Sequence, residues 1–124
     1  MVENRTLRWA AALAAAVLGA AALVAARGHD AEGQEVGEKL LLDNDQVTVY
    51  EFVFPPAFRG EEHAAAANEF AYVLDGEFAV VTKGQGKRTL KRGEIEYAAK
   101  GTIHASLNET SRPARILVVM LKDH

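Results

Sequence analysis

From residue 39 onward, apolar residues come in short runs that are separated by turn-forming residues. The runs cover residues 39–42, 46–54, 69–74, 77–82, 88–90, 94–98, 103–108 and 114–122. Asp, Asn, Gly and Pro fill the gaps between them, with Pro55-Pro56 and Asp75-Gly76 as the strongest breaks. Short runs at regular spacing, without a helical period, predict an all-β antiparallel sandwich or barrel.

Alternation within the runs predicts which side chains face the core. Residues 47–54 place Tyr50, Phe52 and Phe54 on one face of a strand, but the opposite face carries valines. Residues 69–74 and 114–121 are also largely apolar on both faces. A small antiparallel sandwich normally leaves one face of each sheet wet. Something therefore covers the outer face, and we expect either a homodimer or an arm of the chain packing back.

The N-terminus has the features of an export segment. Residues 1–8 carry Arg5 and Arg8, residues 9–26 are uncharged and rich in alanine, and small residues precede a polar stretch. This pattern predicts a signal peptide that is cleaved after residue 26, or an apolar helix retained as a membrane anchor. As a helix the uncharged run measures about 27 Å, at the short edge of what spans a bilayer.

The predicted organisation follows from this segment. Residues 1–26 form the signal or anchor, residues 27–38 form a Gly-rich linker, and residues 39–124 form one domain. We expect an exported protein, periplasmic or extracellular, or one anchored to the cytoplasmic membrane by residues 9–26.

Composition adds few constraints. The formal net charge is −3, and loss of residues 1–26 changes it to −4, which argues against nucleic acid as a partner. Cysteine is absent, so the domain depends on its core, a metal or a partner rather than on disulfides. No Gly-x-Ser-x-Gly motif and no phosphate-binding loop is present.

Residues 61–76, EEHAAAANEFAYVLDG, contain the first candidate site residues, His63 and Glu69. In a helix their six-residue spacing is a rotation of ~600°, so the side chains point to different faces. In one straight strand they share a face but lie ~20 Å apart. They meet only if a strand ends, the chain bends at residues 66–68, and a new strand begins at Glu69.

His104 is the third candidate, because it opens a strand after the turn at Lys100-Gly101. Two imidazoles and one carboxylate are the donor set that holds one face of Fe(II), and Zn or Mn also accepts it. Glu61 is an alternative carboxylate near His63. The same His63, Glu69 and His104 side chains also satisfy one another as a metal-free hydrogen-bonded cluster.

Both stretches resemble the sequence motifs of the cupin family. The first cupin motif is Gly, five residues, His-x-His, three or four residues, Glu, six residues and Gly. His63, Glu69 and Gly76 match it, but Ala57 replaces the first Gly and Ala65 replaces the second His.

The second cupin motif is Gly, five residues, Pro-x-Gly, two residues, His, three residues and Asn. Gly93, Gly101, His104 and Asn108 match it, and Ala99 replaces the Pro. The resemblance covers roughly residues 40–121. It implies a double-stranded β-helix, or jelly-roll barrel, with His63, Glu69 and His104 pointing to one spot inside.

The resemblance leaves two functions open. In the first, the chain is a binding module with a degenerate site that holds a small ligand, with or without a divalent metal, and has no turnover, because Ala65 removes a ligand that metal-binding cupins usually have. In the second, it is a metal-dependent oxygenase- or isomerase-like enzyme that uses His63, Glu69 and His104 around Fe, Mn, Ni or Zn. Whether the protein is an enzyme, and which ligand it binds, are beyond the sequence.

Overall fold

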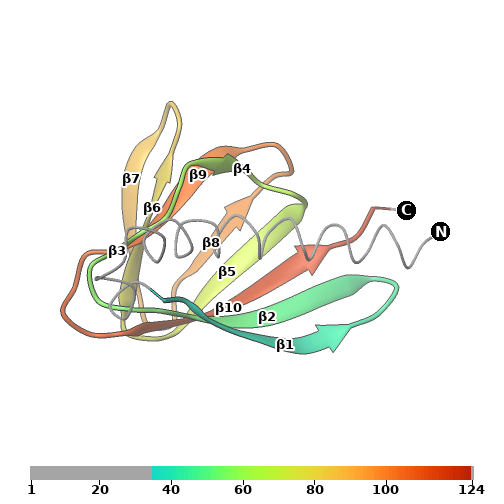
Figure 1. Ribbon diagram of the computed structural model, residues 1–124. Helices are drawn as coiled ribbons and strands as arrows, with labels where there is room; N and C mark the ends of the chain where they lie inside the picture. The colour runs from blue at the N-terminus through green and yellow to red at the C-terminus, as the bar shows by residue number, and fades with distance from the viewer. Residues whose placement is uncertain (1–34, 124) are drawn as a thin grey trace.

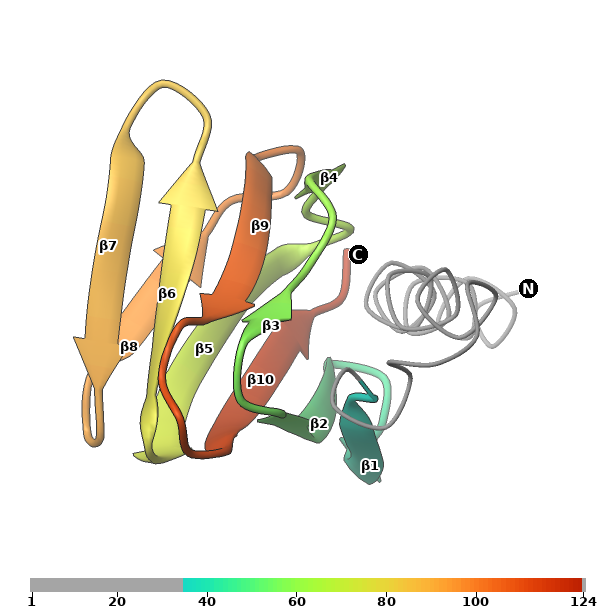
Figure 2. The same cartoon turned by 60° about the vertical axis from the view of Figure 1, so that its left-hand side comes forward.

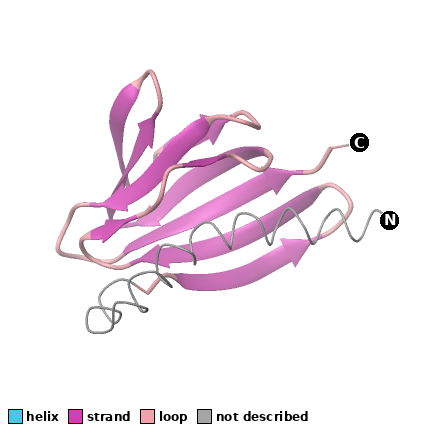
Figure 3. Cartoon of the chain, turned by 45° about the horizontal axis from the view of Figure 1, so that its top comes forward, coloured by secondary structure: helices cyan, strands magenta, loops and turns pink. Residues whose placement is uncertain are grey.

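A computed structural model describes residues 35–123, which form ten β-strands in two facing sheets (Figure 1). The described elements are all strands and loops (Figure 3). The strands are β1 (Gly37–Asp43), β2 (Val47–Phe54), β3 (Phe58–Arg59), β4 (His63–Ala64), β5 (Asn68–Asp75), β6 (Glu77–Thr82), β7 (Gly86–Lys91), β8 (Ile95–Ala98), β9 (Ile103–Asn108) and β10 (Ala114–Leu121).

The first sheet has the strand order β1-β2-β10-β5-β8, and the second has the order β3-β9-β6-β7, with β4 also pairing β9. Every paired strand runs antiparallel to its neighbour. The two sheets face each other around a common interior (Figure 2). This arrangement confirms the all-β antiparallel prediction. The expected N-terminal apolar helix falls outside the described residues.

Strand β2 supplies the aromatic part of the core. Tyr50, Phe52 and Phe54 are buried, as the alternation predicts, and their rings stack in sequence at centroid distances of 5.3 and 6.1 Å. Phe54 also stacks against Phe58 and Phe78 at 5.2 and 6.0 Å, which joins the two sheets. Burial of this apolar surface, at roughly 25 cal/mol per Å², is the main stabilising term of the domain.

A turn forms at Asp75-Gly76 between β5 and β6, where the sequence predicts a break, but it carries the chain from the first sheet to the second and is not a hairpin between paired strands. Gly76 has φ +79°, and a Cβ there would lie 2.5 Å from the carbonyl oxygen of Pro113. Only glycine fits this close approach, so the last Gly of the first motif is structural.

The strand boundaries differ from the sequence prediction in three places. Strand β1 begins at Gly37, within residues assigned to the linker. The two-residue strand β3 was not expected, because two residues are too short to show an alternation. Strand β7 begins at Gly86, two residues before the predicted run. Among residues 35–123, no helix is long and apolar enough to cross a membrane.

Asn108, the last residue of the second motif, also has a structural role. It is fully buried, and its Nδ2 donates hydrogen bonds to the carbonyl oxygens of Phe54 and Arg112, at 3.1 and 2.8 Å. Its Oδ1 accepts bonds from the backbone N–H and the hydroxyl of Thr110. One side chain therefore fixes the end of β2 to the turn between β9 and β10.

Candidate functional site

His63 and His104 lie side by side on the second sheet. Strand β4 pairs with β9 so that His63 is directly opposite His104. The ring centroids are 4.8 Å apart, and the rings meet edge to face at 64°. Because directly opposite residues of an antiparallel pair share a face, both imidazoles point to the same side of the sheet.

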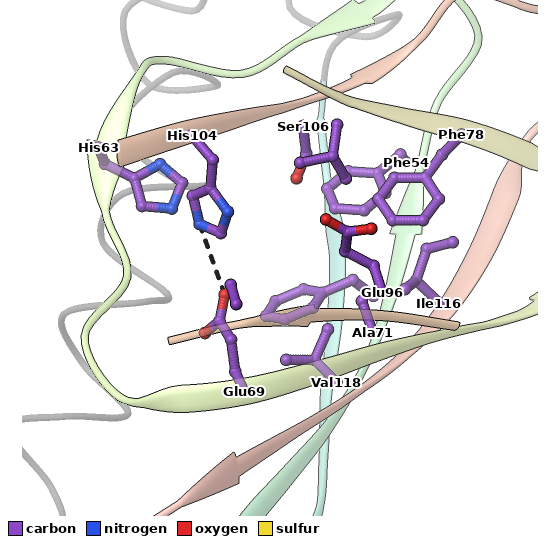
Figure 4. A pocket seen from close by; sticks show the side chains of 13 residues that line it. Phe54, His63, Glu69, Ala71, Phe78, Glu96, His104, Ser106, Ile116 and Val118 are labelled. Atoms are coloured by element: carbon purple, nitrogen blue, oxygen red, sulfur yellow. Dashed lines mark ion pairs between the residues drawn. The ribbon is translucent and has the colours of Figure 1, made fainter. Parts of the chain in front are cut away.

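Glu69 reaches this pair from the facing sheet. The chain bends at residues 66–67 after β4 and re-enters a strand at Asn68, close to the predicted bend. The Asn68 side chain accepts a hydrogen bond of 2.8 Å from the Lys100 backbone, which fastens the bend to the turn before β9. His104 Nε2 then lies 3.5 Å from Glu69 Oε1, drawn as the dashed line in Figure 4. The structure thus brings all three predicted site residues together.

Ala65, the replaced motif position, lies in this connection. It is buried, and its backbone exchanges hydrogen bonds of 2.8 Å with Thr102 and Gly101 in the turn before β9. Ala65 is not among the residues that line the cavity beside the cluster. Within the described chain this residue therefore positions β4 and leaves the ligand role of the motif unfilled.

Burial sets the charges of the cluster. Burial raises the pKa of Glu69 to about 7, because desolvation disfavours the carboxylate. Burial, together with the smaller effect of the charge of His63, lowers the pKa of His104 to about 4. At neutral pH the imidazole of His104 is therefore uncharged. Its 3.5 Å contact with Glu69 is not an ion pair at that pH, although the geometry resembles one.

Two buried polar atoms of the cluster lack a partner. The Nδ1 atom of His63 lies 2.9 Å from the carbonyl oxygen of Glu61 and donates to it in the matching tautomer, so Nε2 carries the lone pair. His63 Nε2 and Glu69 Oε2 are buried without a hydrogen-bond partner among residues 35–123. Buried polar atoms are rarely left unpaired, so the cluster is suited to an occupant. Glu61 contributes its carbonyl group, and its side chain is exposed.

The cluster opens onto a cavity of about 40 Å³ between the two sheets. Figure 4 shows the side chains that line it. The walls are mainly apolar, and the lining residues besides His63, Glu69 and His104 are Phe52, Phe54, Ala71, Phe78, Val80, Glu96, Ala98, Ser106, Ile116 and Val118. A water needs roughly 10–15 Å³ of such space, so the cavity admits a few waters or one small ligand.

The donors fit a divalent ion in their chemistry. A neutral imidazole with Nδ1 bound to a carbonyl oxygen is a usual metal ligand, and two ligands on one ion lie about 3–3.5 Å apart, like His104 Nε2 and Glu69 Oε1. In residues 35–123, however, no three His, Cys, Asp or Glu groups are arranged so that they could hold a metal ion. The metal role of His63, Glu69 and His104 stays a prediction.

The sequence prediction missed Glu96 and Ser106 as cavity residues. In residues 94–98 the natural expectation buries Ile95 and Tyr97 and exposes the glutamates. The structure has the reverse: Ile95 and Tyr97 are 50% and 51% exposed, and the Glu96 side chain is 17% exposed. The available signal was Ala98, which follows Glu96 at a spacing of two and shares its face.

A jelly-roll barrel with a His–Glu–His cluster at the mouth of its cavity defines a small single-domain barrel protein of the double-stranded β-helix class. The family pattern of the cupin domain matches residues 50–120, and this chain belongs to that family. A comparison with curated protein sequences gives no match.

Solved structures of the same fold come from several bacteria. A cupin domain from Bordetella pertussis Tohama I is 22% identical with a TM-score of 0.61, covering 73% of this chain and 96% of that one. The Cupin_2 domain of an XRE family transcriptional regulator from Enterobacter cloacae is 23% identical with a TM-score of 0.65, covering 73% and 100%. The DMSP lyase DddQ from Ruegeria pomeroyi DSS-3 is 22% identical with a TM-score of 0.65, covering 71% and 47%. At these identities the likeness shows the fold alone.

Proposed function

We propose that this cupin domain binds a small ligand in its cavity, with His63, Glu69 and His104 as the polar end of the site and without turnover. The observation that carries the proposal is the pair of buried, partnerless atoms, His63 Nε2 and Glu69 Oε2, beside an apolar cavity. Leaving such atoms unpaired costs about 1–3 kcal/mol each, which a ligand recovers on binding.

The cavity limits the class of ligand. At about 40 Å³ it favours a molecule of only a few non-hydrogen atoms, and its walls favour an apolar middle. The lone pair of His63 Nε2 and the Oε2 atom of Glu69 both accept hydrogen bonds at neutral pH when Glu69 is ionised. A hydrogen-bond donor on the ligand, such as a hydroxyl or an amine, satisfies them.

A metal-dependent enzyme is the second candidate, and one observation favours it. His104 stays uncharged down to about pH 4, which leaves a ring nitrogen available to an ion across the physiological range. Solved structures with this fold include both an enzyme and a domain of a transcriptional regulator, so the fold itself does not choose between the two candidates.

Metal analysis separates the candidates. The purified protein is reconstituted in turn with Fe, Mn, Ni, Cu and Zn, beside His63→Ala and His104→Ala. Stoichiometric metal in the parent protein that is lost in both variants contradicts a metal-free cluster and is the result that the enzyme requires. Absence of metal, together with NMR shifts of the His63 and His104 ring signals on adding small alcohols, supports the ligand-binding module. Absence of both metal and shifts contradicts both candidates.

We further propose that the protein is exported, with residues 1–26 as a cleaved signal or a retained anchor. These residues lie outside the described part of the chain, and the support is the basic start and the uncharged run of the sequence. The intact mass of the protein recovered from cell fractions tests this proposal. A mass that begins after residue 26 supports cleavage, and full-length protein in the soluble cytoplasm contradicts both forms of the proposal.

We also propose that a second copy of the chain covers the outer face of the first sheet. Phe70 and Tyr97 meet there at a centroid distance of 5.0 Å, and Tyr72 and Ile95 pair beside them with large exposed areas. Glu51 and Arg115 form an ion pair at 3.1 Å on this sheet and compensate each other, so two copies do not repel there. Light scattering of the mature protein tests this: a monomer at micromolar concentration contradicts it and favours an arm of the chain as the cover.

A further inference from the structure

Glu96 places a carboxylate in the wall of a mainly apolar cavity. Strand β8 pairs with β5 so that Glu96 is opposite Ala71 and Ala98 is opposite Glu69. All four residues line the cavity, so Glu96 lies on the inner face of the first sheet. It is opposite Ala71, which follows Glu69 by two residues on β5. Figure 4 shows its carboxylate beyond His104, toward Phe54 and Phe78.

Arg88 holds one oxygen of this carboxylate from the opposite sheet. Arg88 is opposite Val80 and Val80 is opposite Ser106, which puts the three in one row across the second sheet. Arg88 Nη1 contacts Glu96 Oε1, and this ion pair joins β7 to β8, the edge strands of the two sheets. In the described chain no second protein partner of the Glu96 carboxylate is found, so Oε2 is available to a ligand.

The charge of Arg88 faces mainly outward. Its side chain is 57% exposed, in a surface groove that it shares with Gln85, Lys87, Glu96 and Tyr97. Glu96 lines both this groove and the inner cavity. The guanidinium group is therefore largely solvated at the edge of the barrel, and the carboxylate is the charged group that the inner wall presents at this level.

The cavity thus has two polar layers. The first contains His63, Glu69 and His104, and the second contains Ser106 and Glu96. Ser106 follows His104 by two residues on β9, and a strand rises about 3.3 Å per residue, so the layers are about 7 Å apart. Ala71, Val80 and Val118 line the walls around them. An apolar residue at position 96 would serve folding at least as well as a charged one.

We propose that Glu96, assisted by Ser106, selects the ligand of this site. The ligand carries a hydrogen-bond donor, hydroxyl or amine, at the Glu96 end and a second polar group at the histidine end, joined by an apolar spacer of three or four carbons. This inference rests on the proposed ligand-binding function. It goes beyond that function by naming a second recognition point and the spacing between the two.

The test compares probes that differ only at one end. 1-Butanol, 1,4-butanediol and 4-amino-1-butanol are titrated into the full protein, with backbone amide and histidine ring signals followed by NMR. We expect the two bifunctional probes to bind about tenfold more tightly than 1-butanol, because each adds a hydrogen bond to a charged group. A tighter amine than diol indicates recognition of positive charge, and equal affinities indicate recognition of the donor alone.

Variants assign the effect to Glu96. Glu96→Gln keeps the shape of the side chain and is expected to remove most of the tenfold advantage, with a smaller loss in Ser106→Ala. Glu38→Gln, an exposed acid on β1, is the matched control and is expected to behave like the parent protein. His63→Ala is expected to weaken all three probes equally, because it acts at the other end of the cavity.

The outcomes separate this inference from the function on which it rests. If all probes bind alike in the parent protein and in Glu96→Gln but still depend on His63, the role of Glu96 is refuted and the ligand-binding function stands. If no probe shifts any cavity signal in the parent protein, both are refuted.

Discussion

Strands β2 and β8 belong to the same sheet, but they use their apolar residues in opposite ways. In β2 the large aromatic residues point inward, and Phe52 is only 1% exposed. In β8 the large apolar residues Ile95 and Tyr97 point outward and are about half exposed, while Glu96 points inward. Side chains alternate between the two faces of the sheet with the same period in both strands, but the large apolar residues face inward in β2 and outward in β8.

The difference lies in what each inner face contacts. The inner face of β2 packs into the aromatic core and gives Phe52 and Phe54 to the apolar wall of the cavity, and a one-residue slip would expose Tyr50, Phe52 and Phe54 together. Strand β8 is a short edge strand that pairs only with β5 among the described strands, and its inner residues Glu96 and Ala98 border the cavity. Apolar residues therefore face inward along β2, and β8 departs from this rule at Glu96, which joins the mainly apolar wall of the cavity.

Truncating the two strands is expected to give the largest contrast. Phe52→Ala removes a fully buried ring and should lower the free energy of unfolding by about 3–5 kcal/mol. Ile95→Ala on β8 should cost less than about 1 kcal/mol, because half of that side chain is already in water. Urea unfolding measures both, and equal losses would contradict the contrast.

Glu69, which is opposite Ala98 at the end of β8, and His104 are expected to control how stability depends on pH. Glu69 has a folded pKa near 7, above its ordinary value of 4.5, so its contribution is full below pH 4.5 and is lost as pH rises through 7. His104 has a folded pKa near 4, below 6.5, so its contribution is full above pH 6.5 and is lost as pH falls through 4. Between pH 4.5 and 6.5 the Glu69 contribution to the free energy of unfolding falls as pH rises, and the His104 contribution rises. The free energy of unfolding of the parent protein should therefore change little over this range.

Glu69→Gln removes one of the two opposing slopes. The free energy of unfolding of this variant should then fall by about 3 kcal/mol from pH 6.5 to 4, since only the His104 term remains. Urea titrations across this range provide the measurement, with the exposed Glu62→Gln as the control. A Glu69→Gln profile that follows the parent protein would refute the assigned shifts.

The turn that ends β2 offers a smaller, stabilising test. Ala57 has φ +62°, a left-handed conformation that costs a residue with a Cβ, and it stands where the cupin motif has glycine. Ala57→Gly should raise the free energy of unfolding by about 0.5–1 kcal/mol, because relief of the strain exceeds the added entropy of the unfolded chain. Thermal unfolding measures the effect, and a lower melting temperature would contradict it.

The outer side of β8 should give the smallest effect on folding and a clear one on assembly. Tyr97→Ser removes an exposed ring and should change the free energy of unfolding of the dissociated chain by no more than about 0.5 kcal/mol. If a second copy covers this face, the same variant should weaken the dimer in light scattering. An unchanged dimer would place the interface elsewhere.

Much of the fold was predictable because strong local signals coincide with the core. The break at Pro55-Pro56, the turn at Asp75-Gly76 and the alternation of Tyr50, Phe52 and Phe54 appear in the structure where the sequence indicates them. The short strand β3 was not predictable, because its pairing with β9 comes from residues about fifty positions away.

The site was predictable to the level of three residues. The spacing of His63 and Glu69 required a bend, His104 was a candidate because it opens a strand after a turn, and the cupin resemblance implied that the three point to one spot. The role of Glu96 was hidden, because in the sequence it looks like a solvent-facing residue next to Ile95 and Tyr97. Only the pairing of β8 with β5, which puts Glu96 opposite Ala71, shows that its side chain faces the cavity.

The sequence alone therefore determined the all-β class, the main turns, the aromatic core and the His–Glu–His set, since each depends on residue type and local spacing. The tertiary structure decided which face of β8 lines the cavity, that two atoms of the cluster lack partners, and that Ala65 lies outside the lining. These features depend on how two sheets face each other. Burial, pairing across strands and the space left between sheets are properties of the assembled chain, and no local pattern encodes them separately.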